Sequence, residues 1–155
     1  MKRLIELKVN GESYHVAIEP RRTLLEVLRE ELGLTGAKEG CDTGACGTCT
    51  VLLDGKPVPS CLVLAVDAQG KDILTIEGLA SGPELHPIQK AFVDCGAIQC
   101  GFCTPGMILT AKALLERNPN PSQAEVKEAI SGNLCRCTGY VKITEAIMTA
   151  AAQER

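Results

Sequence analysis

The chain has 155 residues, of which 45% are hydrophobic and 23% charged, values typical of a soluble globular protein with one domain or two small ones. Its formal net charge is −3 and its only basic runs are two pairs, so nucleic acid and anionic membrane surfaces are poor candidates for partners. It contains nine cysteines but no tryptophan, two tyrosines and two phenylalanines, which leaves the core to leucine, isoleucine, valine and alanine.

The amino terminus lacks the features of a signal peptide. Apolar and polar residues alternate soon after Lys2 and Arg3, and no small-residue cleavage site follows. No apolar run has the length of a membrane span. We therefore expect a cytoplasmic location, although a folded partner can carry a chain without its own signal across a membrane. Cytoplasmic cysteines are mostly reduced, so metal binding explains so many cysteines better than disulfides do.

Two β-strands joined by a tight turn are predicted at the start of the chain. Apolar and polar residues alternate over residues 5–9, and a second strand fits residues 12–18. Asn10-Gly11 lies between them, and these residue types favour the type I′ turn of a hairpin.

A short helix and two further strands are predicted next. Thr23 and Glu26 have the spacing of a capping box, and the helix that they begin should end near Gly33. The further strands fit residues 50–53 and 73–76, with Asp54-Gly55 as a second hairpin-type turn.

A glycine-rich loop between this helix and these strands carries the first of two cysteine sets. Its C-x4-C-x2-C spacing is that of plant-type [2Fe–2S] ferredoxins, and a fourth cysteine follows the next hairpin turn. A cluster loop must wrap tightly and point backbone N–H groups at sulfur, and glycine makes such conformations accessible. The members of this first cysteine set are Cys41, Cys46, Cys49 and Cys61.

Helical patterns replace strand patterns from about residue 79. Four helices are expected: residues 87–94, a helix from Thr104-Pro105 to Asn118-Pro119, one from the Ser122–Glu125 capping box to a C-cap at Gly132, and one from about Tyr140 into the alanine-rich tail. We therefore predict an α+β domain over residues 1–78, joined near residues 79–83 to a helical domain over residues 79–155.

The second cysteine set has the spacing C-x2-C-x31-C-x1-C and comprises Cys100, Cys103, Cys135 and Cys137. One pair runs directly into Thr104-Pro105, and the other runs into Thr138-Gly139-Tyr140, which suggests a second helix start. Two helix N-termini would then converge on one site, where their dipoles and free amides favour an anionic thiolate cluster.

Other interpretations of these residues remain open. Four thiolates also suit structural zinc, although the C-x1-C and C-x4-C-x2-C spacings fit zinc less well. Residues 46–49 and 100–103 each resemble a thioredoxin-type redox pair, which leaves four cysteines without a role. Cys95 lies outside both sets and is expected to be a buried, inert thiol. His15 and His86 are isolated, and no Ser/His/Asp set or phosphate-binding loop is present. The sequence thus predicts electron relay, without catalytic residues in this chain.

Three segments closely resemble those of the iron–sulfur subunit of the molybdenum hydroxylases, the xanthine dehydrogenase family. They are GCDTGACGTCTV (residues 40–51), QCGFCTPGMI (residues 99–108) and GNLCRCTGY (residues 132–140). Relatives in that family include carbon monoxide dehydrogenase, nicotinate and quinoline oxidoreductases, and 4-hydroxybenzoyl-CoA reductase. The resemblance implies a β-grasp ferredoxin-like domain followed by a four-helix bundle, each with one [2Fe–2S] cluster held by one of the cysteine sets.

The same resemblance implies two partner subunits, a large one with a molybdopterin cofactor and a medium one with FAD, in a dimer of heterotrimers. The second set's cluster would lie near the pterin and the first set's near the flavin, so that electrons pass through both. Gln99 would contact the pterin, for which its amide has both donor and acceptor atoms, and Cys137 would lie close to it. The alternative is a stand-alone two-cluster ferredoxin-like carrier. The substrate and the direction of electron flow depend on the partners.

Overall fold

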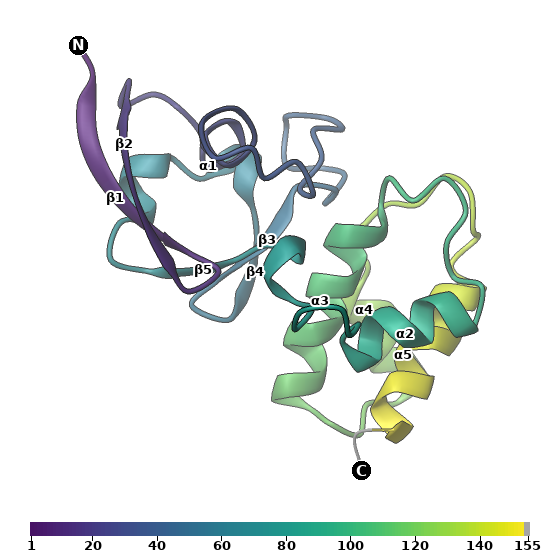
Figure 1. Cartoon of the computed structure of the whole chain (residues 1–155). Coiled ribbons are helices and arrows are strands. Elements are labelled where there is room, and N and C mark those ends of the chain that lie inside the picture. The colour runs from purple at the N-terminus through teal and green to yellow at the C-terminus, as the bar shows by residue number, and fades with distance from the viewer. Residues whose placement is uncertain (154–155) are drawn as a thin grey trace.

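The computed structural model describes residues 1–153, which form a sheet-containing half and a helical half (Figure 1). The first half contains a mixed five-stranded sheet with the strand order β2-β1-β5-β3-β4. β1 and β5 are parallel and the other neighbouring pairs are antiparallel. The strands are β1 (Arg3–Val9), β2 (Glu12–Ile18), β3 (Thr50–Leu53), β4 (Lys56–Pro59) and β5 (Asp72–Leu74).

The predicted hairpins are present. Asn10 and Gly11 have φ values of 52° and 82°, as the type I′ turn between β1 and β2 requires. β5 starts one residue before the predicted strand and ends two residues before the predicted end, so the predicted bounds of this strand were wrong. The N–H of Thr75 donates to Asn10 Oδ1 at 2.9 Å, and the chain then turns into a 3-10 helix.

One short helical segment packs under the sheet. α1 (Leu24–Glu26) starts at the Thr23 capping box, as predicted, and continues as a π-helical turn, η1 (Val27–Glu31). Its leucines and valine are buried in the same core as the inward side chains of β1. Three 3-10 turns complete this half: η2 (Ser60–Leu62), η3 (Ala65–Ala68) and η4 (Ile76–Gly78).

Four helices of the described chain pack around a second core that includes Phe92, Met107 and Ile143. They are α2 (Pro87–Asp94), α3 (Thr104–Arg117), α4 (Gln123–Ala129) and α5 (Val141–Gln153). α2 has the predicted bounds, and α3 and α4 start at the predicted signals. Residues 154 and 155, the end of the predicted second domain, lie outside the described residues.

One predicted helix end was wrong, and one helix starts a single residue after its approximate predicted start. α4 is capped by Ile130, so Gly132 lies beyond the helix in the following loop. α5 begins at Val141, because Tyr140 has a φ of 70°, outside the right-handed helical region.

The two halves are in direct contact, mainly between α3 and β3 (Figure 1). A Cβ atom on Gly106, in the first turn of α3, would lie 2.5 Å from the carbonyl oxygen of Gly47. The helix start therefore packs on the backbone of the cysteine loop itself. No helix among the described residues has both the length and the apolar character of a membrane span.

Candidate metal centres

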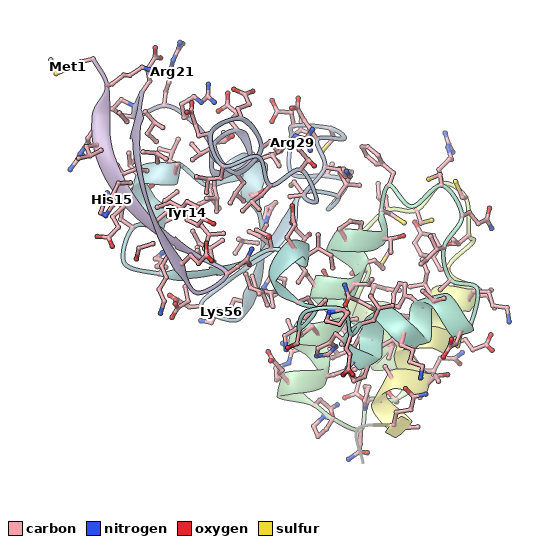
Figure 2. All side chains as sticks on the ribbon, in the orientation of Figure 1. Met1, Tyr14, His15, Arg21, Arg29 and Lys56 are labelled. Atoms are coloured by element: carbon pink, nitrogen blue, oxygen red, sulfur yellow. The ribbon has the colours of Figure 1, made fainter. Side chains whose placement is uncertain are left out.

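The first cysteine set lies in the loop between η1 and β3, and backbone bonds close this loop. The N–H of Lys38 donates to the carbonyl of Thr48 at 3.1 Å. Arg29 reaches from η1 to the start of the loop, where its Nη1 donates to the carbonyls of Thr35 and Ala37 at 3.0 and 2.8 Å (Figure 2). The loop is thereby held at both ends.

Backbone amides converge on the sulfur of Cys41. The N–H groups of Thr43, Ala45 and Cys46 donate to Cys41 Sγ at 3.4, 3.3 and 3.4 Å. Hydrogen bonds from Thr43 and Cys46 lower the pKa of the Cys41 thiol to about 6. The loop therefore stabilises negative charge on this sulfur, which is what a thiolate ligand requires.

The other thiols of the first set are neighbours of Cys41. Cys49 and Cys61 are buried, and their thiols are neighbours. Burial, together with the Cys49 thiol and the charge of Cys41, raises the pKa of Cys61 to about 11. The folded chain thus places Cys41, Cys49 and Cys61 close enough to influence one another's ionisation.

The second cysteine set joins the loop before α3 to the loop before α5, which run side by side (Figure 1). The Cys103 thiol neighbours that of Cys135, and the Cys137 thiol neighbours that of Cys100; each neighbour raises the pKa of its partner, Cys103 or Cys137. Burial raises the pKa of Cys103 to about 12, whereas Cys100 and Cys137 are exposed. This site therefore has one buried and one solvent-facing side.

Only one of the two expected helix N-termini meets this site directly. α3 starts at Thr104, so Cys103 is its N-cap, but α5 starts later than expected. In its place the Thr138 hydroxyl donates to Cys135 Sγ at 3.0 Å, and the Thr138 N–H at 3.4 Å. Burial opposes ionisation of Cys135, but these bonds outweigh it and its thiol pKa lies below the ordinary value.

At both sites the cysteine thiols lie as neighbouring pairs that shift one another's pKa. A [2Fe–2S] cluster divides its four cysteine ligands between two irons, so it needs pairs of thiolates rather than four donors around one ion. Within residues 1–153 no group of three or more His, Cys, Asp or Glu side chains is arranged to hold a single metal ion. The paired thiols, and the N–H groups on Cys41, fit two such clusters.

The two cysteine sets are joined by hydrogen bonds between their loops. The N–H of Leu134 donates to the carbonyl of Cys46 at 2.8 Å. Asn133 is buried beside it, and its Nδ2 donates to the carbonyl of Gly47 at 3.0 Å. Cys46 belongs to the first set, and Leu134 directly precedes Cys135 of the second.

The remaining sequence candidates lie outside these thiol pairs. Gln99 is exposed in the loop before α3. Cys95 is half-buried, with its sulfur 3.6 Å from Thr149 Oγ1. His15 lies on β2, at the sheet edge away from the helical half (Figure 2), and His86 caps α2.

Two protein-family models match the chain in succession: a 2Fe-2S iron–sulfur cluster binding domain over residues 7–75 and a [2Fe-2S] binding domain over residues 75–148. The nicotinate dehydrogenase small FeS subunit of Eubacterium barkeri is 52% identical over 94% of this chain and 93% of its own. The nicotine 6-hydroxylase small subunit of Paenarthrobacter nicotinovorans is 51% identical over 96% and 90%.

The crystal structure of quinoline 2-oxidoreductase from Pseudomonas putida 86 superimposes with a TM-score of 0.95 at 50% identity, covering 97% of this chain and 94% of the matched chain. The chain belongs to the iron–sulfur subunits of the molybdenum hydroxylase family. It is an electron-transfer subunit of a multi-subunit oxidoreductase, with an α+β ferredoxin-like fold and two [2Fe–2S] clusters.

Sequence reasoning about this iron–sulfur subunit missed three residues around the centres. Arg29 lies outside the cysteine motifs, and nothing local indicates its bonds to the loop. Thr138 follows Cys137 directly, so a hydroxyl next to a cysteine of the motif was a local indication of this contact. Asn133 precedes the second pair, but its partners lie 83 and 86 residues away in the first half, beyond any local pattern.

Proposed function

We propose that Cys41, Cys46, Cys49 and Cys61 ligate one [2Fe–2S] cluster and that Cys100, Cys103, Cys135 and Cys137 ligate the other. The first cluster belongs to a β-grasp domain over residues 1–78, and the second to a four-helix bundle over residues 79–155. Two separate hydrophobic cores support this division, because Ile73 packs in the first core and Leu79 in the second.

The main support for an electron relay through this chain is the hydrogen bond between the two cysteine loops. From Cys46 a path runs through its carbonyl oxygen, across the 2.8 Å bond to the Leu134 N–H, and along the backbone to Cys135. Each cluster, when bound, accepts and releases one electron. The chain's own part is to hold the sulfurs, to donate N–H and O–H groups to them, and to keep the loops in contact.

The exposed side of the second centre supports a position for one partner subunit. Cys100, Cys137 and Gln99 are exposed at the second centre. We place the molybdopterin-binding large subunit there, with Gln99 and Cys137 close to the pterin. The FAD-binding medium subunit then lies near the first centre, and the cytoplasmic complex is a dimer of heterotrimers.

Purification of the complex from its native host tests this proposal. The expected complex contains both larger subunits, molybdenum, FAD, and iron for two [2Fe–2S] clusters per copy of this chain. A stable, redox-active monomer of 16.4 kDa without other subunits would contradict the proposal. A colourless zinc-containing chain with no paramagnetic signal after reduction would contradict the cluster ligands.

A further inference from the structure

We propose that Asn133 is a positioning residue that fixes the separation and register of the two cysteine loops. The effect of Asn133 on electron transfer rests on the proposed function, in which the two cysteine sets ligate clusters. The positioning of the two loops is argued from the contacts of Asn133 alone.

Both ends of the Asn133 amide are bonded, and its partners come from both halves of the molecule. Nδ2 donates to the carbonyl of Gly47 at 3.0 Å and to Thr50 Oγ1 at 3.3 Å. Oδ1 accepts from the hydroxyl of Thr110, in α3, at 2.9 Å. The residue is only 5% exposed, so water cannot replace these partners, and leaving one of these groups unpaired is costly.

Glycines on both sides of Asn133 allow the backbones to approach one another. Gly47 has a φ of 71°, and a Cβ on it would lie 2.3 Å from the carbonyl oxygen of Gly132. A Cβ on Gly106 would lie 2.5 Å from the carbonyl oxygen of Gly47. Three backbone segments thus meet without side chains between them, and the Asn133 amide is bonded at their junction.

The position of Asn133 explains how it would act on the relay. Its neighbour Leu134 donates to the Cys46 carbonyl, so a shift of residue 133 also moves this donor. An apolar residue at 133 could fill the space, but it would specify no register, because dispersion contacts are not directional. An amide bonded at both ends specifies one arrangement.

Asn133→Asp in the full chain tests the proposal, because it keeps the shape but turns a carboxylate oxygen toward the carbonyl of Gly47. Amide hydrogen exchange at Leu134 is the readout. We expect exchange there to rise about tenfold or more, the change that corresponds to loss of about 1.4 kcal/mol of local stability. Exchange at Ile147, in α5, should not change, which separates a local opening from general destabilisation.

Two further variants complete the test. Asn120→Asp makes the same chemical change at an exposed position between α3 and α4 and should leave Leu134 exchange unaltered. Thr110→Val removes only the hydroxyl that orients the amide, and it should raise Leu134 exchange by a smaller factor. This second variant also serves if Asn133→Asp does not fold.

The magnetic interaction between the two reduced clusters supplies a second readout. It falls steeply with distance, so we expect it to weaken in Asn133→Asp while the iron content is retained. Unchanged Leu134 exchange together with an unchanged magnetic interaction would overturn the proposal. Failure of the proposed cluster ligands would be seen separately, as iron missing from the unmodified chain.

Discussion

Hydroxyl groups lie close to sulfur at both cysteine sets, and at the second set the Thr138 hydroxyl is directed at Cys135. Thr138 Oγ1 donates to Cys135 Sγ at 3.0 Å and itself accepts the N–H of Tyr140 at 3.2 Å. The Thr48 hydroxyl lies 3.1 Å from Cys46 Sγ, but it donates to the carbonyl of Lys38 at 3.2 Å. The Thr48 hydroxyl is thus shared between a loop carbonyl and a sulfur, whereas the Thr138 hydroxyl donates to the sulfur of Cys135.

Thr138→Val should lower the reduction potential of the second cluster. Hydrogen bonds to ligand sulfur stabilise the extra negative charge of the reduced state, so removing one favours the oxidised state. Loss of about 1 kcal/mol corresponds to a fall of about 40 mV for one electron. A redox titration followed by electron paramagnetic resonance measures it. Thr138→Ser keeps the hydroxyl and should restore the potential; equal potentials in the two variants would refute the hydroxyl's role.

At the scale of the element, the first cysteine loop has a glycine where the backbone is left-handed and an added Cβ would displace the exposed Leu62 side chain. Gly44 has a φ of 77°, and a Cβ there would lie 2.3 Å from Leu62 Cδ1. Its N–H also hydrogen-bonds to the Cys61 thiol and lowers that thiol's pKa, against the larger effect of burial. A residue at this position therefore influences both the shape of the loop and the fourth thiol.

Gly44→Ala should impair the first cluster, and Gly55→Ala is the matched control. Gly55 has the same φ of 77° but no atom within 4 Å of an added Cβ. Both variants carry a left-handed penalty of about 1–2 kcal/mol. Only Gly44→Ala also pushes Leu62 away from the cluster loop, so it alone should lose iron and the first cluster's signal. Equal iron content in the two variants would show that the loop tolerates the side chain.

Local patterns explain which elements the sequence could predict. The Asn10-Gly11 turn and the capping boxes at Thr23 and Ser122 act within a few residues, and all three have the predicted geometry. The ends of β5 and α4 were predicted wrongly. β5 ends where the Thr75 N–H donates to the Asn10 side chain, and α4 ends at Ile130, before the loop that contains Gly132. The bonds of Asn133 depend on how the halves dock, which no short segment encodes.

At the scale of the whole molecule, each cysteine set is anchored in its own hydrophobic core. Cys49 and Cys61 are part of the core of the sheet-containing half, and Cys103 is part of the core of the helices. The loops then meet where Leu134 bonds to Cys46. This architecture gives two separately built centres held at one fixed spacing, which suits an electron relay between partner subunits.

The most direct test of this account is electron paramagnetic resonance of the reduced complex carrying Cys41→Ala or Cys100→Ala. Each variant should lose a different one of the two [2Fe–2S] signals and half of the iron, because the two thiols belong to different sets. Cys95→Ala is the control and should keep both signals, since its thiol lies outside both sets. If Cys41→Ala and Cys100→Ala lose the same signal, the division of the eight cysteines into two clusters is wrong.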